Sequence, residues 1–323
     1  MDKNDRKILV NRILKKMPPT VKHVEYLVDI LEISKESVYR RIRGDIPFNF
    51  DEIIKLSLDL GFSVDEIFMG NASSYAIFGV RSGIFSKPEE VFHIVLEDYY
   101  NLMTQETRSA NGKAIISMNR LFPFLVTKFT HLFKFSYYRW LHQGYDVPLN
   151  FYLSDVTIPD NILSSCQKIN NIQGVDNTTF ILDQGVFLNT LRYVNYYYKR
   201  GLISVHEMDL LKKDILSVID EAEWLMKSDV NDLKNIYDFY LSSVDIESNT
   251  IYVECEGVLS SYFWIHFQSP IVTSNLTVCN AHKRWLDSLK KYSSLITRSN
   301  ELLQADFFEK QRTYLKSIPD ISA

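Results

Sequence analysis

The first 70 residues are divided into short amphipathic segments, each bounded by residues that cap or stop a helix. Apolar residues recur at helical spacing from residue 8 to residue 17. Pro18 and Pro19 end this segment, because proline lacks the amide proton and clashes with the preceding turn. Three further segments and a short closing one follow, at about residues 20–31, 35–43, 49–61 and 63–68. We therefore predict an all-α domain of five short helices.

Polar residues and glycine predict where the central helices begin and end. Thr20 is expected to be the N-cap of the second helix and Ser34 that of the third, because their hydroxyl oxygens can accept a free amide of the first turn. Gly44 is at the expected place for the residue after the third helix. Asn49 or Asp51 can start the fourth helix.

Charge is unevenly distributed, although the whole chain carries only −4. Residues 1–43 hold eleven Lys and Arg against six Asp and Glu, whereas residues 44–70 hold one Lys against six acids. Four of the cations are in the third predicted helix: Lys35, Arg40, Arg41 and Arg43. Nucleic-acid binding requires a local basic face and not a basic total, so this helix is a candidate for it.

Two short helices joined by about three residues, the second one basic and capped by serine, are typical of a helix-turn-helix. The motif L-x-I-S-K-x-S-V at Leu31–Val38 and the closing sequence LGFSVDEIF resemble the lambda-repressor-like (Cro/C1-type) helix-turn-helix family. The likeness is strongest to the variant found in regulators of the Bacteroidetes. It covers about the first 70 residues.

The sequence departs from this family at two positions. Glu32 occupies the turn position that usually holds glycine, so it must adopt a left-handed or nearly left-handed conformation. Arg41 stands where the family usually has an apolar residue, and Ile42 is apolar instead. Either the third helix is rotated by about one residue, or Ile42 takes over the packing role.

The resemblance implies that the third helix enters the major groove of double-stranded DNA. Its groove-facing positions match Ser34, Lys35, Glu36, Ser37 and Arg40. Arg40, or Arg41 if the helix is rotated, is the candidate for a bidentate contact to guanine. Contacts to phosphates, which fix the register without reading the bases, are expected from Thr20, Lys22 and Arg43. Helix-turn-helix proteins usually bind as two-fold dimers, so the resemblance also implies a homodimer.

The remaining sequence predicts a linker at 71–86 and a second domain at 87–323. Helices are expected at 89–103, 121–141, 185–199, 204–227, 276–297 and 301–317, and strands at 113–118 and 178–182. A β-meander is expected at 236–246, 250–255 and 261–267. We predict a mainly α chain of the α+β class with a small antiparallel sheet, and this second domain resembles no family that we recognise.

Two segments of the second domain leave alternatives open. Residues 122–152 hold eleven aromatic side chains, which are expected to form core, with a hydrophobic ligand cavity or a dimer surface as the alternatives. Trp285, Leu289, Tyr292 and Ile296 have a 4-3-4 spacing that suits either a packed terminal helix, which is favoured, or a dimer seam.

The sequence gives little indication of catalysis. It contains no Walker A loop and no GxGxxG, GxSxG or HExxH motif. Cys166, Cys255 and Cys279 are not in CxxC spacing, which favours reduced thiols in a cytoplasmic protein. A contact between Cys255 and His266 across a hairpin is the one catalytic pair that the sequence leaves open. We expect no enzymatic activity, no cofactor, no metal and no membrane span.

These features together predict a transcriptional regulator. The N-terminal domain is expected to bind a specific DNA site, and the C-terminal domain to dimerise the protein; whether it also binds a small-molecule or protein effector is left open. Two other interpretations remain. The helical bundle is a protein-interaction module that uses the acidic segment 44–70, or the C-terminal domain is an enzyme regulated by the N-terminal one. The basic helix also has a simpler explanation as a solvated surface.

Overall fold

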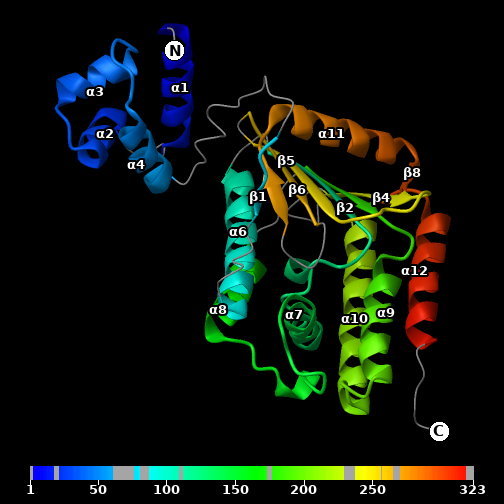
Figure 1. The fold of residues 1–323 in the computed structure, drawn as a ribbon. Helices are drawn as coiled ribbons and strands as arrows, with labels where there is room; N and C mark the ends of the chain where they lie inside the picture. Colours follow the sequence, from blue (N-terminus) through cyan, green and yellow to red (C-terminus); the bar gives the residue numbers. More distant parts are fainter. Residues whose placement is uncertain are drawn as a thin grey trace. The chain divides into compact units, whose positions relative to one another are not determined.

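The computed structural model describes residues 3–17, 22–60, 76–80, 87–108, 112–172, 177–228, 237–255, 257–264 and 270–317. The chain forms two compact units, Met1–Ile77 and Phe78–Ala323 (Figure 1). Residues 79 and 80 of the predicted linker form a strand of the second unit.

The first unit is a bundle of short helices. Those described are α1 (Lys3–Lys16), α2 (His23–Leu31), α3 (Lys35–Ile42) and α4 (Phe50–Leu60). Their apolar faces share one core, in which Leu27, Val38 and Leu56 are fully buried. The predicted fifth helix at 63–68 lies outside the described residues.

Helix ends in this unit follow the local chemistry of the sequence at most positions. Ser34 is the N-cap of α3, and its Oγ accepts the backbone N–H of Ser37 at 3.2 Å, as predicted. Gly44 follows the helix with a φ of 74°, which glycine adopts without strain. Helix α2 begins only after Lys22, so its predicted earlier start is wrong. Thr20, the predicted cap, lies outside the described residues.

The second unit contains a mixed sheet of eight described strands, so the prediction of a small antiparallel sheet is wrong. The strands are, in spatial order, β1 (Gly79–Val80), β7 (Ile271–Thr273), β6 (Val258–Phe263), β5 (Thr250–Cys255), β2 (Lys113–Met118), β3 (Thr178–Leu182), β4 (Tyr237–Ser242) and β8 (Ser293–Leu295). Strands β2, β3 and β4 are parallel to one another, and the other neighbours are antiparallel.

Helical connections explain the parallel part of the sheet. Parallel neighbours need a long crossover, which an α-helix usually supplies. Between β2 and β3 the chain forms η2 (Pro123–Leu125), α7 (Thr130–Gly144), η3 (Leu153–Asp155) and α8 (Asp160–Asn170). Between β3 and β4 it forms α9 (Val186–Lys199) and α10 (Val205–Lys227). The predicted meander is wrong in its first step, because β4 pairs with β3 and β8 and not with β5.

Helices cover both faces of the sheet (Figure 1). Helix α11 (Leu276–Lys291) packs on one face, where Ile181, Tyr252 and Leu286 are buried together. The larger core lies on the other face, against α6 (Pro88–Arg108), α7, α9 and α10. Helix α12 (Glu301–Lys316) packs beside α9 and α10. The mainly helical character predicted for the chain is confirmed.

The aromatic segment 122–152 is largely core, as expected. Buried members include Phe122, Phe124, Phe133, Phe135, Tyr137, Tyr138 and Trp140. Leu125 and Phe129 instead line a mostly apolar cavity of about 290 Å³ between the sheet and the helices. The predicted helix 276–297 ends at Lys291, and the chain then adds β8 to the sheet.

Within the described residues, no helix combines the length and the apolar character that crossing a bilayer requires.

A buried histidine joins α11 to the sheet. The Nδ1 of His282 lies 2.9 Å from Oγ of Ser261, and its Nε2 lies 3.0 Å from Oγ1 of Thr250. Burial lowers the pKa of His282 to about 4. An unfolded chain would protonate this imidazole with the ordinary pKa of about 6.5. The folded state therefore binds fewer protons between pH 6.5 and pH 4, and stability falls as the pH drops through this range.

We predict that lowering the pH from 7 to 5 reduces the unfolding free energy of the wild type by about 2 kcal/mol more than that of a His282→Gln variant. Urea titrations followed by tryptophan fluorescence measure this, since all four tryptophans lie in the second unit. His206→Gln is the matched control, because His206 is exposed. Equal pH dependence of the wild type and His282→Gln would contradict the prediction.

Candidate nucleic-acid interface

The turn between α2 and α3 fixes where the basic helix starts. Glu32 ends α2 with a φ of 54°, so this non-glycine residue adopts the left-handed conformation that the sequence required. Its amide donates to the carbonyl of Val28 at 2.9 Å, and its carboxylate lies 3.4 Å from Nζ of Lys55 on α4. Ser34 then caps α3 two residues later.

Helix α3 has one buried and one exposed face. Val38 is fully buried, and Ile42 packs against the same core. The exposed residues are Lys35, Glu36, Tyr39, Arg40 and Arg43. They are spaced i, i+1, i+4, i+5 and i+8, which places them on one side of a helix. This side consists of three cations, one acid and one aromatic ring.

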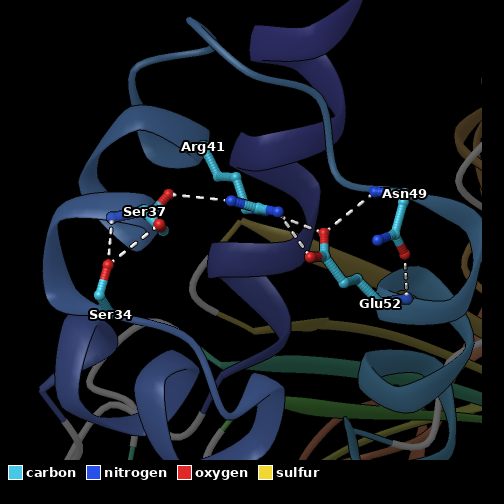
Figure 2. A network of polar contacts seen from close by, with 5 residues as sticks. All are labelled: Ser34, Ser37, Arg41, Asn49 and Glu52. Carbon is cyan, nitrogen blue, oxygen red and sulfur yellow. Dashed lines mark hydrogen bonds and ion pairs between the residues drawn. The ribbon is translucent and has the colours of Figure 1, made fainter.

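Arg41 points away from that exposed side and forms an ion pair with Glu52 of α4 (Figure 2). Its Nε donates to one carboxylate oxygen at 2.9 Å and its NH2 group to the other at 2.6 Å. A third donor reaches the backbone carbonyl of Ser37 at 3.2 Å. The side chains of Arg41 and Glu52 are only 13% and 9% exposed. Such a two-bond pair is among the strongest contacts that a guanidinium makes.

The same carboxylate also holds the start of α4 (Figure 2). The backbone N–H of Asn49 donates to Glu52 at 3.0 Å, and the Asn49 side-chain oxygen accepts the N–H of Glu52 at 2.8 Å. This reciprocal arrangement is a capping box, which satisfies two amides that a helix start leaves free. Of the two predicted start residues, Asn49 is therefore the N-cap and Asp51 is not.

These contacts decide between the two alternatives for α3. Ile42 packs into the core and Arg41 is held by Glu52, so the helix is not rotated to present Arg41. Arg40 is the arginine on the exposed side. Arg41 was also predicted to contact DNA, but in the structure its guanidinium joins α3 to α4 through Glu52.

The exposed cations differ in their neighbours. Among the described residues, no carboxylate lies within ion-pair distance of Lys35 or Arg40. Arg43 lies 3.2 Å from Asp45, and Lys22 lies 3.6 Å from Glu25 with its side chain 82% exposed. These exposed pairs are weak and readily exchanged for another anion. Within the described part of the first unit, no acidic side chain therefore neutralises Lys35 or Arg40.

The two serines at the start of α3 already form hydrogen bonds with each other. The Oγ atoms of Ser34 and Ser37 lie 3.0 Å apart, and Ser37 is half-buried. Tyr39 is 51% exposed and shares the side of Lys35 and Arg43. Tyr39 is not among the predicted DNA-contacting residues, although its spacing of four residues from both cations was a usable signal. Thr20, a predicted phosphate contact, lies outside the described residues.

The catalytic pair that the sequence left open falls partly outside the described residues. Cys255 is half-buried at the end of β5, and His266 lies outside the described residues. In the described part of the chain, no cluster of three or more His, Cys, Asp or Glu residues has the geometry to hold a metal ion.

The capped turn and the outward basic side of α3 define a helix-turn-helix unit. Comparison with known families gives the same class: residues 4–84 match the family model of the BetR domain, a helix-turn-helix type of regulator domain. No curated protein and no solved structure matches the chain.

We predict that Glu52→Gln destabilises the first unit by about 2–4 kcal/mol, because it leaves the Arg41 cation largely buried and without its partner. Hydrogen exchange of amides in α3 and α4 measures this, since the first unit has no tryptophan. Asp51→Asn is the control, because Asp51 is exposed in the same helical turn, and its effect should stay below about 1 kcal/mol. Equal effects of the two substitutions would argue against a structural role for the pair.

Proposed function

We propose that this protein is a transcriptional regulator whose first unit binds a specific site on double-stranded DNA. The observation that carries this proposal is the outward side of α3, where Lys35 and Arg40 have no acidic partner among the described residues. The match of residues 4–84 to the BetR domain supports the same interpretation.

In this proposal α3 enters the major groove and its exposed side reads base edges. Arg40 contacts guanine, whose O6 and N7 accept the two parallel donors of a guanidinium. Glu36, four residues earlier, either orients Arg40 or accepts from a cytosine amino group. Lys35, Ser34 and Ser37 lie near the bases, whereas Arg43, Lys22 and Thr20 contact phosphates.

The second unit supplies dimerisation in this proposal. One short helix reads too few base pairs for useful specificity, so helix-turn-helix proteins gain specificity by binding two half-sites. A homodimer on a roughly palindromic site follows. We place the dimer contact in residues 78–323, because this unit has a large core of its own and so can hold a partner subunit independently of the DNA-binding unit.

One feature of the first unit favours a different function, a protein-interaction module. Phe50, Ile54 and Leu58 of α4 are exposed by 66%, 37% and 80% and recur every four residues, so they form an apolar stripe. Asp51 and Asp59 of the same helix are the sequence neighbours of Phe50 and Leu58. A stripe of this kind suits contact with another protein.

Binding of random duplex DNA across a salt series separates the two functions. A DNA-binding protein loses affinity steeply with salt because it releases counterions from the phosphates. We expect such a slope for the full chain and its loss in a truncated chain lacking residues 1–70. Binding that is absent or insensitive to salt would favour the interaction module.

We predict that Arg40→Ala weakens binding to the specific site by about 1–3 kcal/mol, or roughly 5- to 150-fold, and relaxes the base preference at one position. Fluorescence anisotropy with specific and random duplexes at about 150 mM salt measures both effects. Arg43→Ala is the control on the same helix, because a phosphate contact should affect the two duplexes equally. Unchanged binding by Arg40→Ala would show that its groove assignment is wrong.

Lys22→Ala should act through phosphates alone. We predict that it lowers the slope of log K against log salt by about one unit and leaves the base preference unchanged. The same anisotropy assay, repeated over a series of salt concentrations, gives this slope. A changed base preference would contradict the phosphate assignment.

A further inference from the structure

A polar cleft of about 720 Å³ opens in the second unit beside α7 and α9. Its ten lining residues include Arg120, Arg192, Arg200 and Tyr196. Three of them are arginines, and none is an aspartate or a glutamate. A cleft lined by cations without acids is a candidate for binding an anion.

Three separate parts of the fold meet in this cleft. Helix α9 and its C-cap contribute six lining residues between Asn189 and Arg200. Successive members are alternately three residues and one residue apart, which places them on one side of the helix. The last turn of α7 contributes two residues. Asn119 and Arg120 directly follow β2, at the carboxyl end of a strand in the parallel part of the sheet. Ligands of α/β sheets commonly bind outside such strand ends.

The arginines of the cleft have neutral partners. An NH1 donor of Arg192 reaches the Asn189 side-chain oxygen at 3.2 Å. Arg200 reaches the Tyr196 hydroxyl at 3.4 Å and the carbonyl of Leu149 at 3.5 Å. In the described part of the chain, neither these two arginines nor Arg120 forms an ion pair with a carboxylate. No carboxylate of the described residues therefore neutralises these three charges.

A fourth arginine lies behind the wall of the cleft. Arg139 is only 7% exposed, and its guanidinium lies 4.4 Å from the ring centre of Tyr193, a lining residue. Its Nε is buried with no hydrogen-bond partner among the described residues. Burial, with the nearby cation of Arg120, lowers the pKa of Arg139 to about 10, so it stays charged at neutral pH. Removing a cation from water without a counter-charge is costly, and a bound anion would offset that cost.

The other donors in the cleft suit a phosphate group. Phosphate oxygens accept several hydrogen bonds at once, and the planar fork of arginine matches two of them. Tyr193, Tyr196 and Tyr197 add hydroxyl groups, and burial raises the pKa of Tyr197 to about 12, so that it keeps its proton. Tyr196 is 53% exposed, and the Arg200 guanidinium lies over its ring at 5.7 Å from the ring centre. The arginine and the ring together provide planar groups against which a base can stack.

We propose that this cleft binds a small molecule that carries a phosphate group, with a nucleotide as the class that uses both its arginines and its exposed aromatic ring. The volume of the cleft falls within the usual range for small-molecule sites. The site lies entirely within the second unit, so it is independent of whether α3 binds DNA.

Isothermal titration of the full-length protein with pyrophosphate and with ATP, each at low salt, tests the proposal. We expect saturable binding of both probes, with ATP tighter because its base stacks on Tyr196. The double substitution Arg192→Gln and Arg200→Gln should weaken binding of both probes at least tenfold. Both side chains are exposed, so the variant should fold, and its tryptophan fluorescence and melting temperature without ligand check this.

Arg284→Gln is the matched control, because Arg284 is an exposed arginine of α11 that does not line the cleft. Its affinity for both probes should equal that of the wild type. Absence of binding by both probes would overturn the proposal, as would binding that the double variant retains.

A DNA titration distinguishes the cleft from a nucleic-acid surface. If the double variant loses affinity for duplex DNA while neither small probe binds the wild type, the cleft contacts a nucleic acid and the proposal is wrong. Loss of DNA binding by Arg40→Ala with unchanged pyrophosphate binding supports the cleft as a site of its own. Failure of DNA binding in the wild type leaves the pyrophosphate result to decide this proposal alone.

Discussion

The ion pair between Arg41 and Glu52 sets the orientation of the basic helix, and the proposed function depends on that orientation. Arg40, Arg41 and Arg43 lie close together at the C-terminal end of α3, and only Arg41 points inward, toward Glu52. Because Glu52 holds both Arg41 and the amide of Asn49, it fixes α3 and the start of α4 through one carboxylate. A pair of this kind adds little net stability compared with apolar packing, but an unpaired member is costly. The ion pair therefore favours one rotational orientation of α3, in which Arg40 faces outward.

Local chemistry made much of the first unit predictable. The hydroxyl of Ser34, the glycine at position 44 and the apolar period around Val38 each depend on a few neighbouring residues, so they can be read from sequence alone. The partner of Arg41 could not be found in this way, because Glu52 is eleven residues away and on another helix. Helical periodicity identifies a residue that faces inward, but it does not identify the polar group that this residue contacts.

The second unit shows the same contrast between features that neighbouring residues determine and contacts between distant residues. The strands at 113–118, 178–182 and 250–255 were predicted with their observed bounds, because alternation and β-branched residues are local signals. Their pairing was not, since β2 bonds to β5 across more than 130 residues of chain. The cleft beside α9 was missed for a related reason. Its lining residues come from three separate segments, 119–120, 142–143 and 189–200. The tyrosines of α9 had no sequence feature that distinguished a cleft from a core.

The two proposals divide the roles between the units, with DNA reading assigned to the first and binding of a phosphate-bearing ligand to the second. Selection of duplexes from a random pool by the full-length protein, at about 150 mM salt, should enrich a motif that contains guanine in two symmetric half-sites. Recovery of unenriched sequence, with the protein folded and the pool in excess, would show that the first unit reads no specific DNA site.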